Sequence, residues 1–158
     1  MTMKISRIYV DTSVFGGCFD QEFAEWSLGL MEDFRRARYR AVVSEVVSAE
    51  IAGAPEKVRI IFQEQLSHGA EIAVLSQEAR ILLDAYRNHE ILGPRYRNDM
   101  LHIALATVAQ ADALVSWNFK HIVRFDKIQQ FNGVSLEHGY RSLAIYSPRE
   151  VTTHGRQG

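Results

Sequence analysis

The sequence predicts an α/β protein in which helices cover both faces of a mainly parallel sheet, a three-layer α/β/α sandwich. Short apolar runs alternate with longer amphipathic segments, as they do in βαβ units. Polar residues close two of these runs, Asp11 after Ile8–Val10 and Asn118 after Ala113–Trp117. Because the carboxyl ends of parallel strands meet along one edge of a sheet, we expect these side chains to lie close together.

A single domain is expected over residues 1–151, followed by a disordered polar tail over residues 152–158. The chain has 158 residues, which is enough for a continuous apolar core, and its 47% hydrophobic content is that of an ordinary globular protein. Residues 1–7 lack the apolar stretch of a signal peptide, and no apolar run approaches the roughly 20 residues that span a bilayer. We therefore expect a cytoplasmic protein without membrane contact.

Charge and cysteine content exclude several classes of function. The net charge of −1 gives no overall attraction for a polyanion, so nucleic-acid binding would need a local basic patch. Cys18 is the only cysteine, which excludes an intramolecular disulfide and a zinc site built from several thiolates. This use of cysteine fits a reducing compartment.

The secondary-structure elements follow from hydrophobic periodicity and from capping residues. Strands are expected at residues 5–10, 40–43, 71–75, 113–117 and 142–146. Helices are expected at residues 22–38, 45–51, 58–66, 77–86 and 99–111. Ser44 and Ser76 are the expected N-caps of two of these helices, and Gly16-Gly17 an expected turn. The helix at 99–111 is apolar almost all round, so it should be buried against the sheet.

Asp11 has two interpretations. An aspartate at the end of a strand is commonly a turn former. Here Thr12 and Ser13 follow it, and their hydroxyls could orient a metal-bound water. A cluster of acids at such an edge needs a counter-charge, which a divalent metal with oxygen ligands would supply.

Asp99 lies in the expected first turn of a helix, where the helix dipole stabilises a carboxylate by about 0.3–1 kcal/mol. Asn98 is available as the cap, which would leave the Asp99 carboxylate free. His102 follows three residues later on the same helix face. A histidine in such a position is more often a hydrogen-bonded packing residue than a metal ligand.

Glu45 and Glu50 compete for a third acidic position. Five residues of helix correspond to a rotation of about 500°, so the two side chains diverge by roughly 140°. Glu45 lies at the helix start, where it complements the dipole. Glu50 lies among apolar residues, where an unpaired carboxylate would be costly and a metal ion would remove that cost. Glu50 is therefore the better candidate.

Basic residues are expected around these acids. Arg95 and Arg97 directly precede Asp99, and Lys120 and His121 directly follow Asn118. Such residues suit a substrate with a phosphate backbone, although an ordinary solvated face would look the same.

Four segments of the chain resemble the motifs of the PIN domain family. They are, in order, Val10–Ser13, Ser44–Ile51, Asp99–Ala104 and Ser116–His121. The resemblance extends from Ile8 to about Val151 and is to the VapC-type ribonuclease toxins of bacterial toxin–antitoxin pairs. It implies an α/β/α sandwich with a Mg²⁺ or Mn²⁺ site at the edge of a parallel sheet.

Carried over by position, the resemblance implies that Asp11, Glu50 and Asp99 bind the metal and act in catalysis, and that Ser13 supports the site. Asn118 stands where the family often has a fourth acid and would be a further ligand. An amide oxygen is a weaker ligand than a carboxylate for a hard cation, so this difference bears on whether a second metal binds.

The implied function is a metal-dependent endoribonuclease toxin. Water would attack the phosphorus in line and leave a 5′-phosphate and a 3′-hydroxyl. The resemblance also implies an RNA substrate, an inhibitory antitoxin protein and a homodimer. Apolar residues of the helix at 22–38 would supply part of the dimer surface, although core packing explains them equally well.

Two other functions fit parts of the sequence. A PIN-like module that binds RNA or a protein partner without catalysis would account for Asn118. A phosphatase of the haloacid-dehalogenase kind also has an aspartate after its first strand. That chemistry needs a second aspartate two residues later, where this chain has Ser13, so we disfavour it.

Overall fold

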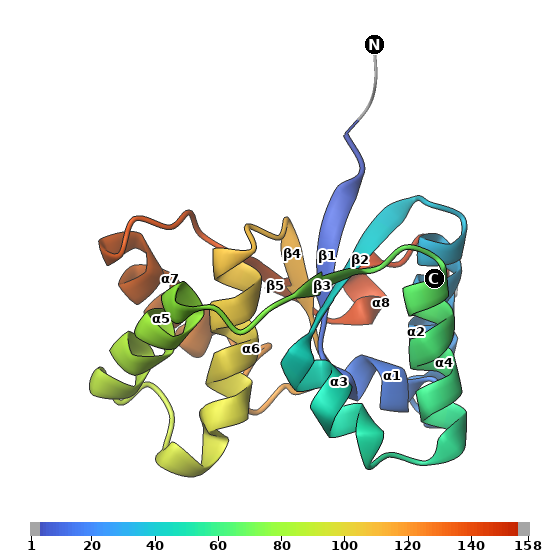
Figure 1. Ribbon diagram of the computed structural model, residues 1–158, viewed down its shortest axis with the longest axis horizontal. Coiled ribbons are helices and arrows are strands. Elements are labelled where there is room, and N and C mark those ends of the chain that lie inside the picture. Colours follow the sequence, from blue (N-terminus) through green and yellow to red (C-terminus); the bar gives the residue numbers. More distant parts are fainter. Residues whose placement is uncertain (1–3, 155–158) are drawn as a thin grey trace.

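In the computed structural model, which describes residues 4–154, parallel strands form one sheet between two layers of helices (Figure 1). The strands are β1 Ser6–Val10, β2 Tyr39–Ser44, β3 Glu71–Ala73, β4 Ala113–Val115 and β5 Ala144–Tyr146. Their spatial order is β3-β2-β1-β4-β5, and every pairing is parallel. The predicted α/β/α sandwich is confirmed.

The strand order reverses between β1 and β4, at the centre of the sheet. From β1 the chain moves outward to β2 and β3, then returns to the other side of β1 as β4. Val10 is paired with Val115, and the N–H of Asp11 donates to the carbonyl of Val115 at 3.3 Å. Ligands of open α/β sheets bind at such a reversal, outside the carboxyl ends of the strands.

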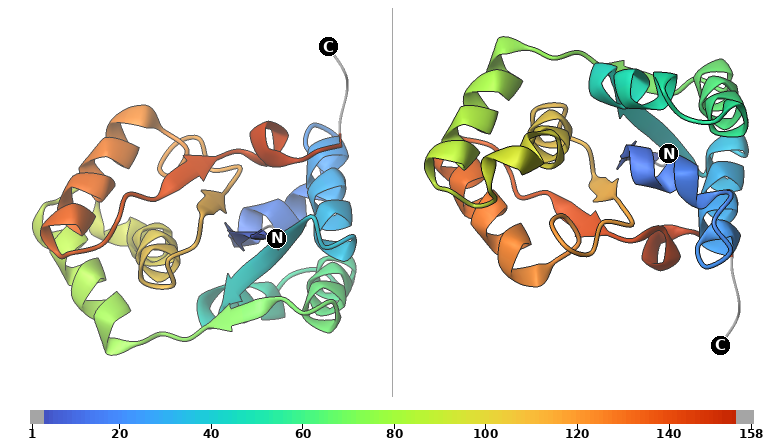
Figure 2. Two further views of the ribbon diagram at one scale, coloured as in Figure 1. Left: turned by 90° about the horizontal axis from the view of Figure 1, so that it is seen from above. Right: turned by 90° about the horizontal axis from the view of Figure 1, so that it is seen from below.

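The helices form two layers. They are α1 Thr12–Gly17, α2 Ala24–Arg35, α3 Glu45–Ala52, α4 Glu56–Ser67, α5 Gln77–Asn88, α6 Arg97–Val108, α7 Phe125–Glu137 and α8 Pro148–Val151, with a 3₁₀ turn η1 at Pro94–Tyr96. Helices α1, α2 and α4 lie on one side of the sheet, and α5, α6 and α7 lie on the other (Figures 1 and 2). No helix within residues 4–154 is long and apolar enough to cross a bilayer.

Local sequence signals account for several of these elements. Ser44 caps α3, since its hydroxyl accepts the N–H of Val47 at 3.2 Å, and Ser76 caps α5 in the same way through Ala79. Residues 100–107 of α6 are all buried, as its continuous apolar sequence predicts. Both caps and the buried helix are therefore confirmed.

Two local predictions are wrong, and one helix was not predicted. Gly16 and Gly17 lie in α1 and form no turn there. Gly17 is required for packing, because a Cβ at this position would lie 2.6 Å from Nε1 of Trp117. Asn98 is not a cap, since η1 leads directly into α6 and Asn98 is the second residue of that helix. Helix α7 covers residues that the sequence analysis did not assign to a helix.

Residues 152–154, the first part of the expected tail, contact α2. Asp33 of α2 is fully buried and accepts the Thr152 hydroxyl at 2.8 Å and the Thr153 N–H at 3.0 Å. The Thr153 hydroxyl also donates to Asp33, and His154 lies against Gly29 of α2. Residues 155–158 of the expected tail lie outside the described residues.

The aromatic residues near α2 pack within the chain. Phe23 stacks on Trp117 with ring centroids 4.1 Å apart, and Trp26 lies beside the same ring. Leu30 and Phe34 are buried in the core, whereas Leu28 is 45% exposed. Core packing therefore accounts for most of the apolar residues that could have formed a dimer surface.

Candidate active site

Asp11 follows β1 and precedes α1, so it lies where the strand order reverses. Two serine hydroxyls donate to its carboxylate, Ser13 to Oδ1 and Ser116 to Oδ2, each at 2.6 Å. The same hydroxyls accept backbone N–H groups, Ser13 from Trp117 and Ser116 from Asn118, both at 2.9 Å. The loop after β4 thus fixes the two serines, and the serines fix the Asp11 carboxylate.

The environment of Asp11 is unfavourable to its negative charge. The residue is only 4% exposed. Burial raises the pKa of Asp11 above its ordinary value, although the proximity of His102 and the hydrogen bonds from Ser116 and Ser13 oppose this shift. A buried carboxylate is costly unless a positive charge compensates it, and hydroxyl donors carry none. Asp11 is therefore suited to holding a cation.

Asp99 lies in the first turn of α6 and interacts with residues of α3 and of the loop after β4. Burial raises the pKa of Asp99, and the negative charge of Glu50 raises it further. His121, His102 and a hydrogen bond from Asn118 lower it. The fold thus brings Glu50 and Asp99 near enough for their charges to repel each other.

The amide of Asn118 has an orientation that differs from the one expected of a metal ligand. Its Oδ1 accepts the N–H of Lys120 at 3.2 Å and the N–H of His121 at 3.0 Å, which closes a tight turn after β4. The hydrogen bond to Asp99 therefore comes from the NH₂ group of Asn118. Asn118 faces the acids as a donor to a carboxylate, with its oxygen turned away.

Glu50 is held by His102 and Thr12. Its Oε1 accepts from Nε2 of His102 at 2.7 Å and from the Thr12 hydroxyl at 2.8 Å. The Glu50 side chain is 33% exposed, so the expectation of a buried carboxylate is wrong. Burial by itself would raise the pKa of Glu50, but His102, Thr12 and Asn98 together bring it below its ordinary value. From the sequence alone, a metal ion was expected to compensate the Glu50 carboxylate. In the structure His102 is the partner of that carboxylate.

His102 is enclosed by the core and uses both ring nitrogens. It is 3% exposed, and its Nδ1 lies 2.8 Å from the Tyr9 hydroxyl, which lies 2.8 Å from the Ser44 hydroxyl. Burial raises the pKa of Tyr9, so its phenol remains uncharged. His102 therefore lies where a supporting residue would, and neither ring nitrogen is free for a metal.

Glu45 points away from this cluster, as the helical rotation predicts. Its Oε2 accepts the N–H of Leu75 at 2.8 Å, at the end of the segment that follows β3. Of the two candidate glutamates, Glu50 alone therefore contacts the other site residues.

The predicted substrate-binding cations lie on two neighbouring segments. Tyr96 packs on the ring of His121, with centroids 3.9 Å apart, and the guanidinium of Arg95 lies 5.3 Å from the Tyr96 ring. Arg95, Arg97 and Lys120 are exposed. The segment before α6 and the loop after β4 therefore form one basic and aromatic rim beside Asp99.

Two cations farther along, Arg124 at the end of the loop after β4 and Lys127 in α7, have other partners. Arg124 pairs with Asp126 at 2.8 Å, and Lys127 donates to the carbonyl of Ile91 at 2.8 Å. Phe119 of the same loop is 50% exposed. Lys120 and Phe119 are therefore exposed side chains of this loop that a ligand can reach.

Comparison with known proteins identifies the family. The PIN domain family model matches residues 8–128. The chain belongs to the PIN domain family. Its fold is similar to one in the crystal structure of VapBC2 from Rickettsia felis bound to a DNA fragment from their promoter. That match has a TM-score of 0.58 and 17% sequence identity, and it covers 88% of this chain and 96% of the other. No curated protein matches the chain.

The side chains of this PIN domain fit a divalent cation by their chemistry. Asp11, Glu50 and Asp99 are carboxylates at one edge of the sheet, and carboxylate oxygens are the preferred ligands of Mg²⁺. Within residues 4–154, however, no group of three or more His, Cys, Asp or Glu side chains is arranged to hold a metal ion. The serines on Asp11 and the contacts of His102 and Thr12 with Glu50 occupy carboxylate oxygens instead.

Sequence analysis did not find two of the residues that shape the PIN site. Ser116 was noted only as part of a motif, and Tyr9 only as part of a strand. Alternation along β1 places the Tyr9 side chain on one face of the sheet, but its contact with His102 requires the position of α6. The sequence feature that could have indicated Ser116 is its position at the end of a buried strand.

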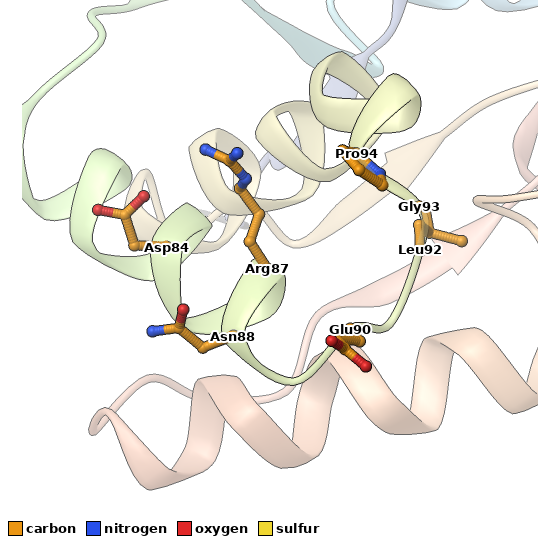
Figure 3. Close-up of a pocket in the computed structure, with 7 residues that line it drawn as sticks. All are labelled: Asp84, Arg87, Asn88, Glu90, Leu92, Gly93 and Pro94. Carbon is orange, nitrogen blue, oxygen red and sulfur yellow. The ribbon is translucent and has the colours of Figure 1, made fainter.

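A cavity of about 720 Å³ lies away from the acids, between the end of α5 and the segment before η1 (Figure 3). Its polar lining residues are exposed side chains, Asp84, Arg87, Asn88 and Glu90. None of the site residues described above lines it. This cavity is therefore separate from the PIN site.

Proposed function

We propose that this protein is a metal-dependent endoribonuclease and that it acts as a VapC-like toxin. The observation that carries the proposal is the position of Asp11 where the strand order reverses, with His102 close enough to influence Asp11 and Asp99 and hydrogen-bonded to Glu50. Burial raises the pKa of both aspartates. A raised pKa is expected of buried carboxylates that bind a cation, when that cation is absent. Membership of the PIN domain family supports the same chemistry.

Asp11, Glu50 and Asp99 would hold Mg²⁺ or Mn²⁺, with Glu50 as a direct or a water-mediated ligand. The ion supplies Lewis-acid activation of water and neutralises negative charge that develops on the phosphate. The protein orients its acids for this task, because Ser13 and Ser116 fix Asp11, and His102 fixes Glu50. Asn118 would act as a hydrogen-bond donor to Asp99 and not as a ligand.

The substrate would be RNA with unpaired nucleotides near the scissile bond. Arg95, Arg97 and Lys120 are exposed cations beside Asp99, and His121 adds a further donor, so they would contact the phosphate backbone. The exposed ring of Phe119 offers a surface on which an unpaired base can stack.

Partners and location follow from the same proposal. A VapC-like toxin would bind a small antitoxin protein in the cytoplasm and would form a homodimer. The similar fold in a structure of VapBC2 supports an antitoxin partner for this chain. The search for a partner would begin with copurification from the native organism.

The proposal is tested by incubating the purified protein with total RNA and Mn²⁺ and mapping new 5′ ends by sequencing. We expect discrete ends with a 5′-phosphate. These ends should disappear with a chelator and in Asp11→Asn, because an amide at position 11 cannot supply a charged ligand. Glu45→Gln is the matched control, since Glu45 points away from the cluster, and it should cleave normally. Full cleavage by Asp11→Asn, or cleavage with chelator present, would refute the proposal.

Asn118 is the feature that favours the second candidate, a PIN-like module that binds RNA or a partner without catalysis. Asn118→Asp keeps the acceptor that closes the turn but places a carboxylate against Asp99. We expect Mn²⁺ affinity to rise about tenfold, since an anionic ligand binds a hard cation better than an amide. Calorimetric titration with Mn²⁺ measures the change, and the RNA assay accompanies it. Tighter Mn²⁺ binding with no cleavage by either protein would favour the binding module.

A further inference from the structure

A buried chain of hydrogen bonds leads from the core to Glu50. The Ser44 hydroxyl lies 2.8 Å from the Tyr9 hydroxyl, Tyr9 lies 2.8 Å from Nδ1 of His102, and Nε2 of His102 lies 2.7 Å from Glu50. These four residues come from β2, β1, α6 and α3. These hydrogen bonds thus join two neighbouring strands and helix α6 to one carboxylate of the site, which lies on α3.

The hydrogens of this chain can be assigned from its acceptors. The Ser44 oxygen already accepts the N–H of Val47, and the Glu50 carboxylate can only accept. Nε2 of His102 must therefore carry a hydrogen. In a neutral ring Nδ1 is then the acceptor, Tyr9 donates to it, and Ser44 donates to Tyr9. Every polar atom of the chain has a partner in this arrangement.

We propose that Tyr9 and His102 are positioning residues for Glu50, with the buried Tyr9 hydroxyl holding the His102 ring in the orientation that turns Nε2 toward Glu50. The role that we give to Glu50 rests on the proposed nuclease function. The hydrogen bonds that link Ser44, Tyr9, His102 and Glu50 do not depend on that role.

The burial of the chain shows why it can hold Glu50. Tyr9 is 0% exposed and His102 is 3% exposed, so packing fixes both rings. Glu50 is long, flexible and 33% exposed, and it lies on the short helix α3. Its hydrogen bond to the rigidly packed His102 ring restricts the motion of the Glu50 side chain. Such outer partners of a metal-binding group typically change affinity or activity by about 10- to 100-fold when they are removed.

Tyr9→Phe tests the proposal, and Tyr86→Phe is its matched control. Tyr86 is also 0% exposed, and its hydroxyl lies 2.7 Å from the Ser135 hydroxyl between α5 and α7. Both variants therefore remove one buried phenol–serine hydrogen bond, but Tyr9→Phe alone also removes a donor to His102. A general loss of core stability would affect the two variants alike.

The first readout is the hydrogen bonding of the two His102 ring nitrogens, measured from long-range ¹H–¹⁵N NMR correlations without metal or RNA. We expect hydrogen on Nε2 in the wild type and in both variants, because Glu50 can only accept, and we expect the Nδ1 resonance to shift in Tyr9→Phe but not in Tyr86→Phe, because Tyr9→Phe removes the hydroxyl beside Nδ1. A wild-type ring without hydrogen on Nε2, or a Tyr9→Phe spectrum equal to the wild type, would overturn the proposal. Because no nuclease step enters this measurement, it remains decisive if the protein cleaves no RNA.

The second readout is Mn²⁺ affinity by calorimetry. We expect Tyr9→Phe to weaken binding about tenfold, and Tyr86→Phe to change it by less than about twofold. His102→Gln, which retains an N–H donor for Glu50, should bind Mn²⁺ more tightly than His102→Leu, which has none. Equal Mn²⁺ affinities of Tyr9→Phe and Tyr86→Phe would show that Tyr9 is a packing residue only. Absence of RNA cleavage by the wild type, in contrast, would count against the proposed nuclease function.

Discussion

Replacing Asp33 by alanine is expected to lower the free energy of unfolding by about 3–5 kcal/mol. Asp33 is fully buried in α2, and it receives three hydrogen bonds from Thr152 and Thr153. Arg38 and His154 lie within 3.7 Å and 3.4 Å of the same carboxylate. A hydrogen bond to a charged group contributes about 1.5–3 kcal/mol, and alanine would leave these donors without an acceptor.

Urea unfolding of Asp33→Ala and Asp126→Ala would measure this effect. Asp126 pairs with Arg124 on the surface, where both side chains are about half exposed, so its loss should cost less than about 1 kcal/mol. Ending the chain after residue 151 should reproduce most of the Asp33→Ala effect, because it leaves the buried carboxylate without its threonine donors. Equal stabilities of the two alanine variants would contradict the network that ties the C-terminal segment to α2.

Sequence predicted the elements whose causes are local. Ser44 and Ser76 cap helices through their own backbone neighbours, and the apolar sequence of α6 requires burial whatever its partners are. The prediction of a turn at Gly16-Gly17 was wrong because a glycine can be required by close packing as well as by a turn. Gly17 is small because Trp117, distant in sequence, packs against it.

The candidate site was predictable as a set of acids but not as a network. The parallel sheet brings Asp11 and Asn118 to one edge by its topology, which periodicity reveals. The partners of those residues depend on tertiary packing. Nothing local indicates that Tyr9 reaches His102, that His102 reaches Glu50, or that the Asn118 oxygen turns toward its own loop. Sequence therefore located the acids, and the fold determined which groups hold them.

Asp99→Asn is expected to lower the rate of RNA cleavage by at least about 100-fold and, in the absence of metal, to stabilise the fold. Burial and the charge of Glu50 hold the pKa of Asp99 above its ordinary value of 3.8. The favourable contribution of Asp99 to the stability of the fold is therefore complete below pH 3.8, and it is lost as the pH rises through the pKa of Asp99 in the folded state. At pH 8 the ionised Asp99 destabilises the metal-free protein, and asparagine removes this cost.

Asp112→Asn should have the opposite effect on stability. Hydrogen bonds from the N–H of Arg7 and from Lys4 hold the pKa of Asp112 below its ordinary value. Its contribution is thus present above the ordinary value and lost as pH falls through the folded-state pKa. Asp112 lies beside β1 at the end of the strands remote from Asp11, so its replacement should leave cleavage unchanged.

Thermal unfolding in EDTA between pH 3 and pH 8 separates the two variants. We expect Asp99→Asn to raise the Tm at pH 8 by about 2–4 °C, which corresponds to roughly 1 kcal/mol in a domain of this size, and Asp112→Asn to lower it. The difference caused by Asp99→Asn should vanish toward pH 3, where Asp99 is protonated, whereas the difference caused by Asp112→Asn should begin to shrink only as the pH falls below 3.8. Adding Mn²⁺ at pH 8 should raise the Tm of the wild type and of Asp112→Asn, but not of Asp99→Asn. A destabilised Asp99→Asn would mean that Asp99 is a structural acid whose ionised form stabilises the fold, contrary to its raised pKa.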